Sequence, residues 1–323
     1  MSGSILYLSR ADVERAALPM REVIDIVERA FREKGEGRLE MPPKPGIHTR
    51  QDSFIHAMPA YLSAMEAVGV KWVSGYPGNI RKGLPYVSGL MILNDAETGF
   101  PTAVMDCTWI TAVRTGAATA VAAKFLARKE SSSAGIVACG VQGRSNLEAL
   151  ACLFALRKVK AYDLRPEAAR RFSQEMGRAL GIEIEPVSRL EEAVKDLDLV
   201  VSSGPIVKEP APAIEPGWLA PGAFACPLDF DSSWQGAALR EADRIVTDDT
   251  AQWEYYRRDG YFRQTPAPDA DLGEIAAGKK PGRRREDERI VSLNLGIAME
   301  DVATAVVLFK RAKDLGIGRE LPL

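Results

Sequence analysis

The sequence is poor in the residues that bind transition metals or form disulfides. It has two histidines, His48 and His56, and four cysteines at scattered positions without a C-x-x-C pair. Neither an H-E-x-x-H motif nor a cysteine cluster occurs, so we expect neither a structural nor a catalytic zinc ion. The cysteines are expected to be buried free thiols in a reducing cytoplasm.

The sequence also lacks long apolar runs and an excess of charge of one sign. Residues 1–15 have no apolar core typical of a signal peptide, and no stretch reaches the roughly 18 uncharged apolar residues of a membrane span. Lys and Arg number 42 against 44 Asp and Glu. The dense charge run at 278–289 mixes both signs without aromatic residues, which is typical of a solvated loop. We therefore expect a cytoplasmic protein that binds neither nucleic acid nor membranes.

The first part of the chain has the pattern of a helix followed by a mostly antiparallel sheet. Apolar residues at helical spacing predict a helix over 19–34. Strands are predicted at 68–75, 87–94 and 101–106, and the turn residues of 94–99 predict a hairpin between the last two. An alanine-rich helix is predicted over 111–128.

From residue 134 onward, short apolar strands alternate with helices. Strands are predicted at 134–140, 158–164, 197–203, 223–228 and 244–249, with helices at 145–157 and 166–180. This alternation predicts a doubly wound, Rossmann-type parallel sheet at about 126–297. A second, mixed α/β lobe for substrate binding and dimerisation is expected from 1–125 together with 298–323. Its last helix, from Ala298, is expected to pack on that lobe or on a partner subunit.

The most specific motif is the turn between the strand at 134–140 and the helix that follows. It reads Ala138-Cys139-Gly140-Val141-Gln142-Gly143, a G-x-G-x-x-G fingerprint whose first glycine is alanine. Gly140 would let a pyrophosphate approach the backbone, and Gly143 would let the helix pack closely on the strand. We predict that Gly140, Val141, Gln142 and Gly143 bind a dinucleotide. Ala138 leaves the turn less room than glycine would.

An acidic residue follows this turn at the spacing of a ribose-binding group. Asp163 lies at the end of the next predicted strand, 23 residues beyond Gly140. Its carboxylate would accept hydrogen bonds from the adenosine 2′-hydroxyl and repel a 2′-phosphate, which favours NAD. Arg165, two residues on, weakens that preference, so NADP remains an alternative. Ser203, at the end of a later strand, is a further candidate for cofactor binding.

Several segments resemble the ornithine cyclodeaminase/mu-crystallin family, in the family's order along nearly the whole chain. They are GVKWVSGYPGN (69–79), the run from AETGF to AKFLA (96–127), GVQG (140–143), PGAFACPLDFD (221–231) and LGIAMEDVATA (295–305). The family includes cyclodeaminases, alanine dehydrogenases and ketimine or imine reductases. The resemblance thus implies an NAD(P)-dependent homodimer whose active site lies between its lobes.

The resemblance also implies roles for individual residues. Lys71 and Arg114 match the basic residues that bind the substrate carboxylate, Lys71 also assisting proton transfer, and Lys44 stands where many members have a third. Asp231 matches the acidic residue that handles protons at the reacting nitrogen, although an alignment slip would exchange it with Asp229. Ser88 would line the pocket, and Thr115 and Leu228 the cofactor site.

Elementary chemistry agrees with this set, because an α-amino or α-imino acid needs its carboxylate fixed by cations and a proton donor at nitrogen. One position departs from the cyclodeaminases: His56 stands where they carry a glutamate for the distal amine, and imidazole is a poor partner for an ammonium group. We therefore expect imine reduction or amino-acid dehydrogenation, as in alanine dehydrogenase. The alternatives are ornithine cyclodeamination to proline and ammonia, and a non-catalytic NAD(P)-binding protein.

Overall fold

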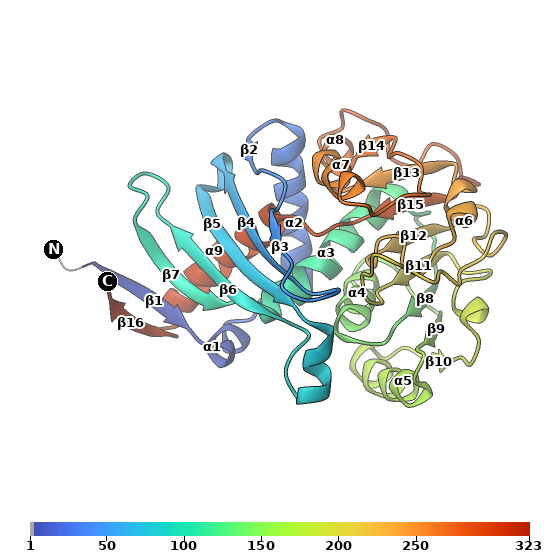
Figure 1. Ribbon diagram of the computed structural model, residues 1–323, viewed down its shortest axis with the longest axis horizontal. Helices are drawn as coiled ribbons and strands as arrows, with labels where there is room; N and C mark the ends of the chain where they lie inside the picture. The colour runs from blue at the N-terminus through green and yellow to red at the C-terminus, as the bar shows by residue number, and fades with distance from the viewer. Residues whose placement is uncertain (1–2) are drawn as a thin grey trace. The chain divides into compact units, whose positions relative to one another are not determined.

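Two sheets of eight strands each organise the chain in the computed structural model, which describes residues 3–323 (Figure 1). Met1 and Ser2 lie outside the described residues. The chain divides into two units: the first takes residues 3–114 and 296–323, and the second takes Thr115–Leu295. The mixed α/β fold with one parallel sheet confirms the predicted fold class.

The sheet of the first unit is mostly antiparallel, with one parallel pair between β1 and β7. Its order is β16-β1-β7-β6-β5-β4-β2, with β3 also paired to β4. The predicted hairpin at 94–99 is confirmed, since β6 and β7 pair antiparallel. The strands are β1 (Ser4–Leu8), β2 (Leu39–Glu40), β3 (Gly46–Ile47), β4 (Phe54–Leu62), β5 (Ala67–Gly75), β6 (Val87–Asn94), β7 (Pro101–Asp106) and β16 (Arg319–Pro322).

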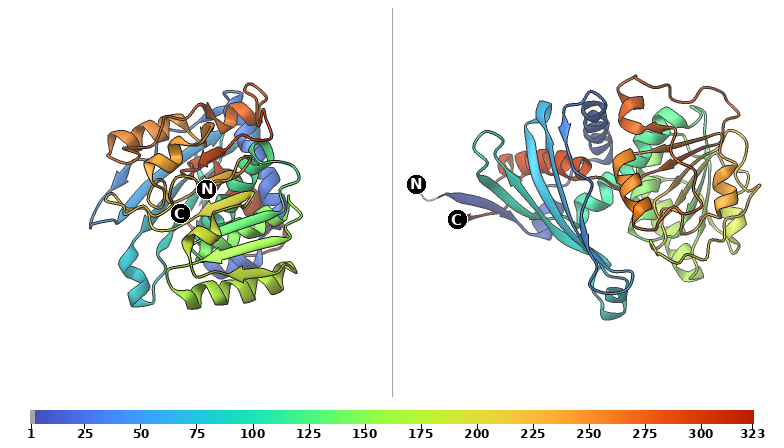
Figure 2. Two further views of the ribbon diagram at one scale, coloured as in Figure 1. Left: turned by 90° about the vertical axis from the view of Figure 1, so that its right-hand side faces the viewer. Right: turned by 45° about the horizontal axis from the view of Figure 1, so that its top comes forward.

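One face of this sheet is covered by helix. The last helix, α9 (Ala298–Asp314), packs on β4, β5, β6 and on α2 (Met20–Gly35); the right-hand view of Figure 2 shows α9 alongside the strands. Alternate residues of β5 are buried, as the period of two along a strand requires for a sheet with one covered face. Short helical segments α1 (Arg10–Arg15), η1 (Ser63–Met65) and η2 (Pro77–Lys82) complete the unit.

The second unit contains a parallel sheet in the order β10-β9-β8-β11-β12-β15-β13-β14. From β8 the chain proceeds outward through β9 and β10 on one side, and then through β11 and β12 on the other, as in a Rossmann fold. The strands are β8 (Ser133–Val137), β9 (Lys158–Tyr162), β10 (Ile184–Pro186), β11 (Leu199–Ser202), β12 (Phe224–Pro227), β13 (Arg244–Thr247), β14 (Ala270–Asp271) and β15 (Ile290–Leu293).

Helices connect these parallel strands. They are α4 (Val141–Ala151), α5 (Pro166–Leu180), η3 (Leu190–Ala193), α6 (Gly236–Arg240), α7 (Thr250–Arg258) and α8 (Leu272–Ala276), while α3 (Thr108–Leu126) precedes β8. The helix predicted at 145–157 instead begins at Val141 and ends at Ala151. Phe154 and Leu156 follow the end of the helix and are buried in the turn toward β9. Their apolar side chains continue the helical pattern in the sequence, which made the predicted helix too long at this end.

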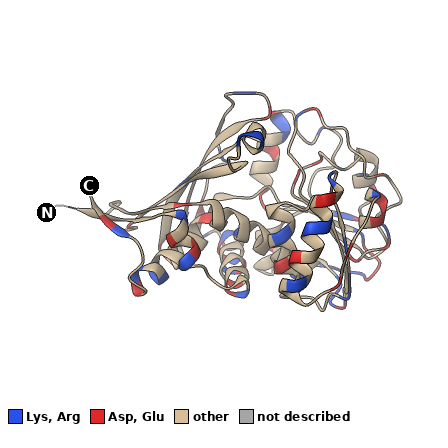
Figure 3. Ribbon diagram, turned by 90° about the horizontal axis from the view of Figure 1, so that it is seen from below, with Lys and Arg blue, Asp and Glu red and all other residues tan. Residues whose placement is uncertain are grey.

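Charge is distributed without a preferred sign. Lys and Arg alternate with Asp and Glu along the ribbon of residues 3–323 (Figure 3). Several of these residues form ion pairs one helical turn apart, such as Arg32 with Glu28. Within the same residues, no helix has both the length and the apolar character needed to cross a bilayer.

Candidate functional site

The central feature of the first unit is a buried lysine in the middle of a strand. Lys71 on β5 is 1% exposed and lies between Met58 of β4 and Met91 of β6 in the sheet register. An ammonium group in such surroundings requires a partner. Its Nζ is 2.6 Å from Oδ2 of Asp301 on α9 and donates a longer hydrogen bond, 3.5 Å, to Oγ1 of Thr111.

Arg114 of α3 meets the same carboxylate from another element. Its Nε donates to Oδ1 of Asp301 at 3.0 Å, and its Nη1 donates to Oε2 of Glu300 at 2.6 Å. Asp301 therefore bridges Lys71 and Arg114, one oxygen to each. Both carboxylates are fully buried in the first turn of α9, where the helix dipole favours negative charge.

Lys44, the third predicted basic residue, is hydrogen-bonded to the segment just before α9. Its Nζ donates to the carbonyl of Gly296 at 2.8 Å. Gly296 has φ +71°, and a Cβ at this position would lie 2.5 Å from Nη1 of Arg114. The segment from Gly296 to Asp301 thus contacts Lys44, Lys71 and Arg114.

His56 lies in β4 on the same face of the sheet as Lys71. Its ring stacks on Phe54, with 4.3 Å between the centroids, and packs over Gly46 of β3. Burial, together with the electrostatic effect of the neighbouring Lys44, His48 and Lys71, lowers the pKa of His56 to about 3. The imidazole is therefore neutral at physiological pH. Burial also lowers the pKa of Lys71, while the charge of Asp301 opposes that shift.

Ser88 does not join this group. It pairs with Ser74 in the register of β5 and β6, and the hydroxyl of Ser74 donates to the Ser88 carbonyl at 3.2 Å. Because side chains alternate along a strand, Ser74 and Ser88 lie on the face of the sheet opposite Lys71 and Val73.

The fingerprint turn lies in the second unit, between β8 and α4. Ala138 has φ +75°, a conformation that favours glycine. A Cβ on Gly143 would lie 2.5 Å from the Ala138 carbonyl oxygen, so only glycine lets α4 pack this closely. No described atom lies within 4 Å of a Cβ built on Gly140, the N-cap residue of α4. Neighbouring protein atoms therefore do not explain the glycine at 140.

Asp163 connects the turn that follows β8 with the turn that follows β9. Its Oδ2 accepts from the backbone N–H of Cys139 at 2.9 Å, and its Oδ1 accepts from that of Arg165 at 3.0 Å. The guanidinium Nε of Arg165 is 3.8 Å from Asp163 and mostly exposed. Ser203 donates to the carbonyl of Ala138 at 3.2 Å. Val141 is 63% exposed, while the Gln142 carbonyl accepts from Asn146.

The structure separates the two aspartates that the sequence left interchangeable. Asp229 is fully buried and accepts hydrogen bonds from the hydroxyls of Ser202 and Ser233 and from the backbone of Gly204. Asp231 is partly exposed and accepts from Thr265 at 3.3 Å. Burial raises the pKa of both carboxyl groups.

Two other predicted cofactor-binding residues lie near these elements in the second unit. Leu228 directly follows β12, and its backbone N–H donates to the Ser202 carbonyl at 2.8 Å. Thr115 lies within α3, one residue beyond Arg114, and is partly buried.

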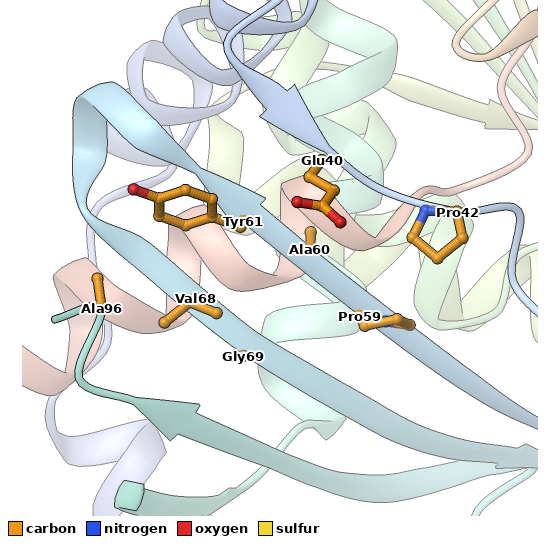
Figure 4. Close-up of a pocket in the computed structure, with 8 residues that line it drawn as sticks. All are labelled: Glu40, Pro42, Pro59, Ala60, Tyr61, Val68, Gly69 and Ala96. Carbon is orange, nitrogen blue, oxygen red and sulfur yellow. The ribbon is translucent and has the colours of Figure 1, made fainter. Parts of the chain in front are cut away.

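A hollow on the first unit is lined by none of these residues. Figure 4 shows the residues that line it, on β2, the β2–β3 connection, β4, β5 and the β6–β7 turn: Glu40, Pro42, Pro59, Ala60, Tyr61, Val68, Gly69 and Ala96. Its one charged side chain is a carboxylate, and it includes none of the predicted site residues. The residues that line this hollow therefore include no cation that could bind a substrate carboxylate.

The sequence reasoning missed Glu300, Asp301 and Gly296 as parts of the site. A signal was present: two adjacent acidic residues stand inside the otherwise apolar run of α9, in a segment that already resembled the family. Helical periodicity could not indicate that both would be buried against cations from β5 and α3.

A parallel sheet of this order, with a glycine turn after its central strand, defines a Rossmann-type α/β protein. The model of the Ornithine cyclodeaminase/mu-crystallin family matches residues 5–316, and the chain belongs to this family. An alanine dehydrogenase of Archaeoglobus fulgidus is 37% identical over 332 residues, covering 98% of each chain.

Two solved structures are similar over almost the whole chain. One is a Thermococcus litoralis Δ1-pyrroline-2-carboxylate reductase in complex with NADH and L-proline, with 36% identity, a TM-score of 0.89 and coverage of 98% of this chain and 99% of that one. The other is an archaeal alanine dehydrogenase dimer with bound NAD, with 36% identity, a TM-score of 0.87 and coverage of 99% of both.

Proposed function

We propose that this chain is an NAD-dependent oxidoreductase that transfers a hydride at the α-carbon of a small amino or imino acid. It would act as an imine reductase or an amino-acid dehydrogenase. The observation that carries the proposal is the buried group of Lys71 and Arg114 on one carboxylate, with neutral His56 on the same sheet face. The reductase and the alanine dehydrogenases similar to this chain act on substrates of this class.

The residues of the fingerprint turn fit a dinucleotide. The open space beside Gly140, the close packing at Gly143 and the backbone N–H groups at the start of α4 suit a pyrophosphate. Asp163 would bind the adenosine ribose, with NAD preferred over NADP, and Ser203, Leu228 and Thr115 would line the cofactor site. Bound NAD supplies the hydride donor or acceptor.

The basic residues would hold the substrate by its carboxylate. Arg114 offers a planar guanidinium, Lys71 a point charge, and Lys44 a third cation next to Gly296. Asp231 would give or take the proton at the substrate nitrogen. Its raised pKa suits this role, because an acid/base works best with a pKa near the working pH.

His56 favours this reaction over ornithine cyclodeamination. A neutral imidazole whose pKa is about 3 gives a distal ammonium group no negative charge to pair with. It does suit a small side chain, a ring such as that of proline, or a side chain ending in oxygen.

We further propose that the chain forms a homodimer through the outer face of the first sheet. Trp72 and Leu90 are paired on that face and are 46% and 44% exposed. The alanine dehydrogenase that resembles this chain is a dimer. A reducing cytoplasm remains the expected compartment, since Cys107, Cys139 and Cys226 are buried free thiols.

The test is a matched assay of the purified protein with NADH and NADPH. Δ1-Pyrroline-2-carboxylate would be offered alone, and pyruvate, glyoxylate and oxaloacetate with ammonia or methylamine; L-proline, L-alanine and L-ornithine would be offered with NAD. We expect NADH oxidation with at least one imine and loss of that activity in Lys71→Ala and Asp231→Ala. Normal turnover in both variants, or proline and ammonia from ornithine without net NADH, would overturn the proposal.

A further inference from the structure

We infer that Asp301 is the positioning residue of this site: its carboxylate holds Lys71 and Arg114 together in the arrangement that receives the substrate carboxylate. This inference rests on the proposed function. It adds a third element, α9, to the strand and helix that carry the two cations. No role was predicted for Asp301 from the sequence.

The geometry distinguishes Asp301 from its neighbour Glu300. Asp301 places Oδ2 at 2.6 Å from Lys71 and Oδ1 at 3.0 Å from Arg114, so one planar group fixes the separation of the two cations. Glu300 contacts the far side of the guanidinium through Nη1. Loss of Asp301 would therefore disturb both cations, whereas loss of Glu300 would leave the ion pair with Lys71 in place.

Asp301 also favours the charged form of Lys71. Burial and the neighbouring Arg114 both lower the pKa of Lys71, and the ion pair and hydrogen bond with Asp301 raise it. The other groups near Lys71 are Thr111 of α3, Cys107 just before α3, and His56 of β4. Cys107 and His56 do not replace a lost carboxylate, since burial raises the pKa of the Cys107 thiol to about 11 and His56 is neutral.

The experiment compares Asp301→Asn, Asp301→Glu and Glu300→Gln with the unaltered protein. The Lys71 signal of protein labelled with 13C-lysine, assigned by its absence in Lys71→Met, is titrated without substrate. In Asp301→Asn we expect the pKa of Lys71 to fall by about one unit or more, and in Glu300→Gln to change less. This measurement requires no turnover, so its result does not depend on the proposed activity.

Kinetics supply the second reading. In Asp301→Asn we expect KM for the amino or imino acid to rise roughly 10-fold or more, with NADH affinity unchanged. The pH at which kcat/KM falls on the alkaline side should decrease together with the pKa of Lys71. Asp301→Glu keeps the charge but moves the carboxylate, so this pH should stay unchanged while KM rises.

Three outcomes would overturn the inference. Asp301→Asn could show an unshifted Lys71 titration with unchanged KM, so that only thermal stability suffers. Glu300→Gln could lower the pH at which kcat/KM falls as far as Asp301→Asn does. If Asp301→Asn fails to fold, Asp301→Glu decides, because unchanged KM and kcat would mean that the carboxylate position is immaterial. Absence of turnover by the unaltered protein on every substrate counts against the proposed function instead.

Discussion

The Nζ of Lys44 donates a 2.8 Å hydrogen bond to the carbonyl of Gly296, across 252 positions of the sequence. The same glycine has φ +71°, and its Cα faces the guanidinium of Arg114. A left-handed backbone at one residue therefore directs a carbonyl to one proposed substrate-binding cation and makes room for another.

This relationship predicts that Gly296→Ala damages substrate binding as well as stability. The added Cβ would lie 2.5 Å from Nη1 of Arg114, and alanine is strained at this φ. We expect the free energy of unfolding to fall by about 2 kcal/mol, and KM for the amino or imino acid to rise roughly 10-fold because both cations move. Chemical denaturation and steady-state kinetics measure the two effects.

Gly37→Ala is the matched control. Gly37 also has a left-handed backbone, with φ +77°, but no described atom lies within 4 Å of the Cβ that would be added. We expect a loss of stability of about 1 kcal/mol from backbone strain alone, with KM unchanged. An equal rise of KM in both variants would contradict the role given to Gly296.

The two glycines of the fingerprint turn should respond differently to alanine. Gly140→Ala meets no described atom within 4 Å, so stability should hold within about 0.5 kcal/mol while NADH binding weakens roughly 10-fold or more. Gly143→Ala meets the Ala138 carbonyl at 2.5 Å and should also lose about 2 kcal/mol of stability. Denaturation and NADH fluorescence titration check both; undiminished NADH affinity in Gly140→Ala would argue against a pyrophosphate there.

The parallel sheet and its turn could be predicted from the sequence because their signals are local. Strands buried on both faces give continuous apolar runs, and glycine marks the place where α4 approaches β8. The short strand β1 and the edge strand β16 were not predicted. They pair with each other across the whole chain, and strands of four or five residues carry little periodicity.

Of the buried group around Asp301, only the cations were predicted. Lys71 and Arg114 were identified through the family resemblance, and a lysine in an apolar strand is costly and therefore also conspicuous. Its partner Asp301 lies 230 positions away on a helix whose first turn has acidic residues, a pattern that by itself indicates ordinary helix-dipole stabilisation. The pairing depends on α9 packing against β5, which no local pattern encodes.

The neutral state of His56 makes stability depend on pH. The pKa of His56 is about 3 in the folded protein and ordinarily 6.5, so between these values the unfolded chain binds a proton that the folded chain does not. The stabilisation is complete above pH 6.5 and is lost as pH falls toward 3. Between pH 7.5 and 5.0 this costs about 2 kcal/mol.

His56→Gln removes this dependence. We expect the difference in unfolding free energy between pH 7.5 and 5.0, measured by urea denaturation, to be about 2 kcal/mol smaller in the variant than in the unaltered protein. An identical difference in both would mean that folding does not lower the pKa of His56 from its ordinary value of 6.5, and the argument from a ring that stays neutral would fail.

Asp231 and Asp229 can be distinguished by matched asparagine substitutions. Asp231 is partly exposed with one side-chain donor, Thr265, so Asp231→Asn should fold normally while kcat falls roughly 100-fold through loss of the acid/base group.

Asp229 accepts from two hydroxyls and a backbone N–H, and an amide turns an N–H group toward one of these donors. Asp229→Asn should therefore lose about 2 kcal/mol of stability. Thermal unfolding beside single-turnover rates separates the two. A large loss of rate in a fully folded Asp229→Asn, with Asp231→Asn active, would assign the proton transfer to Asp229.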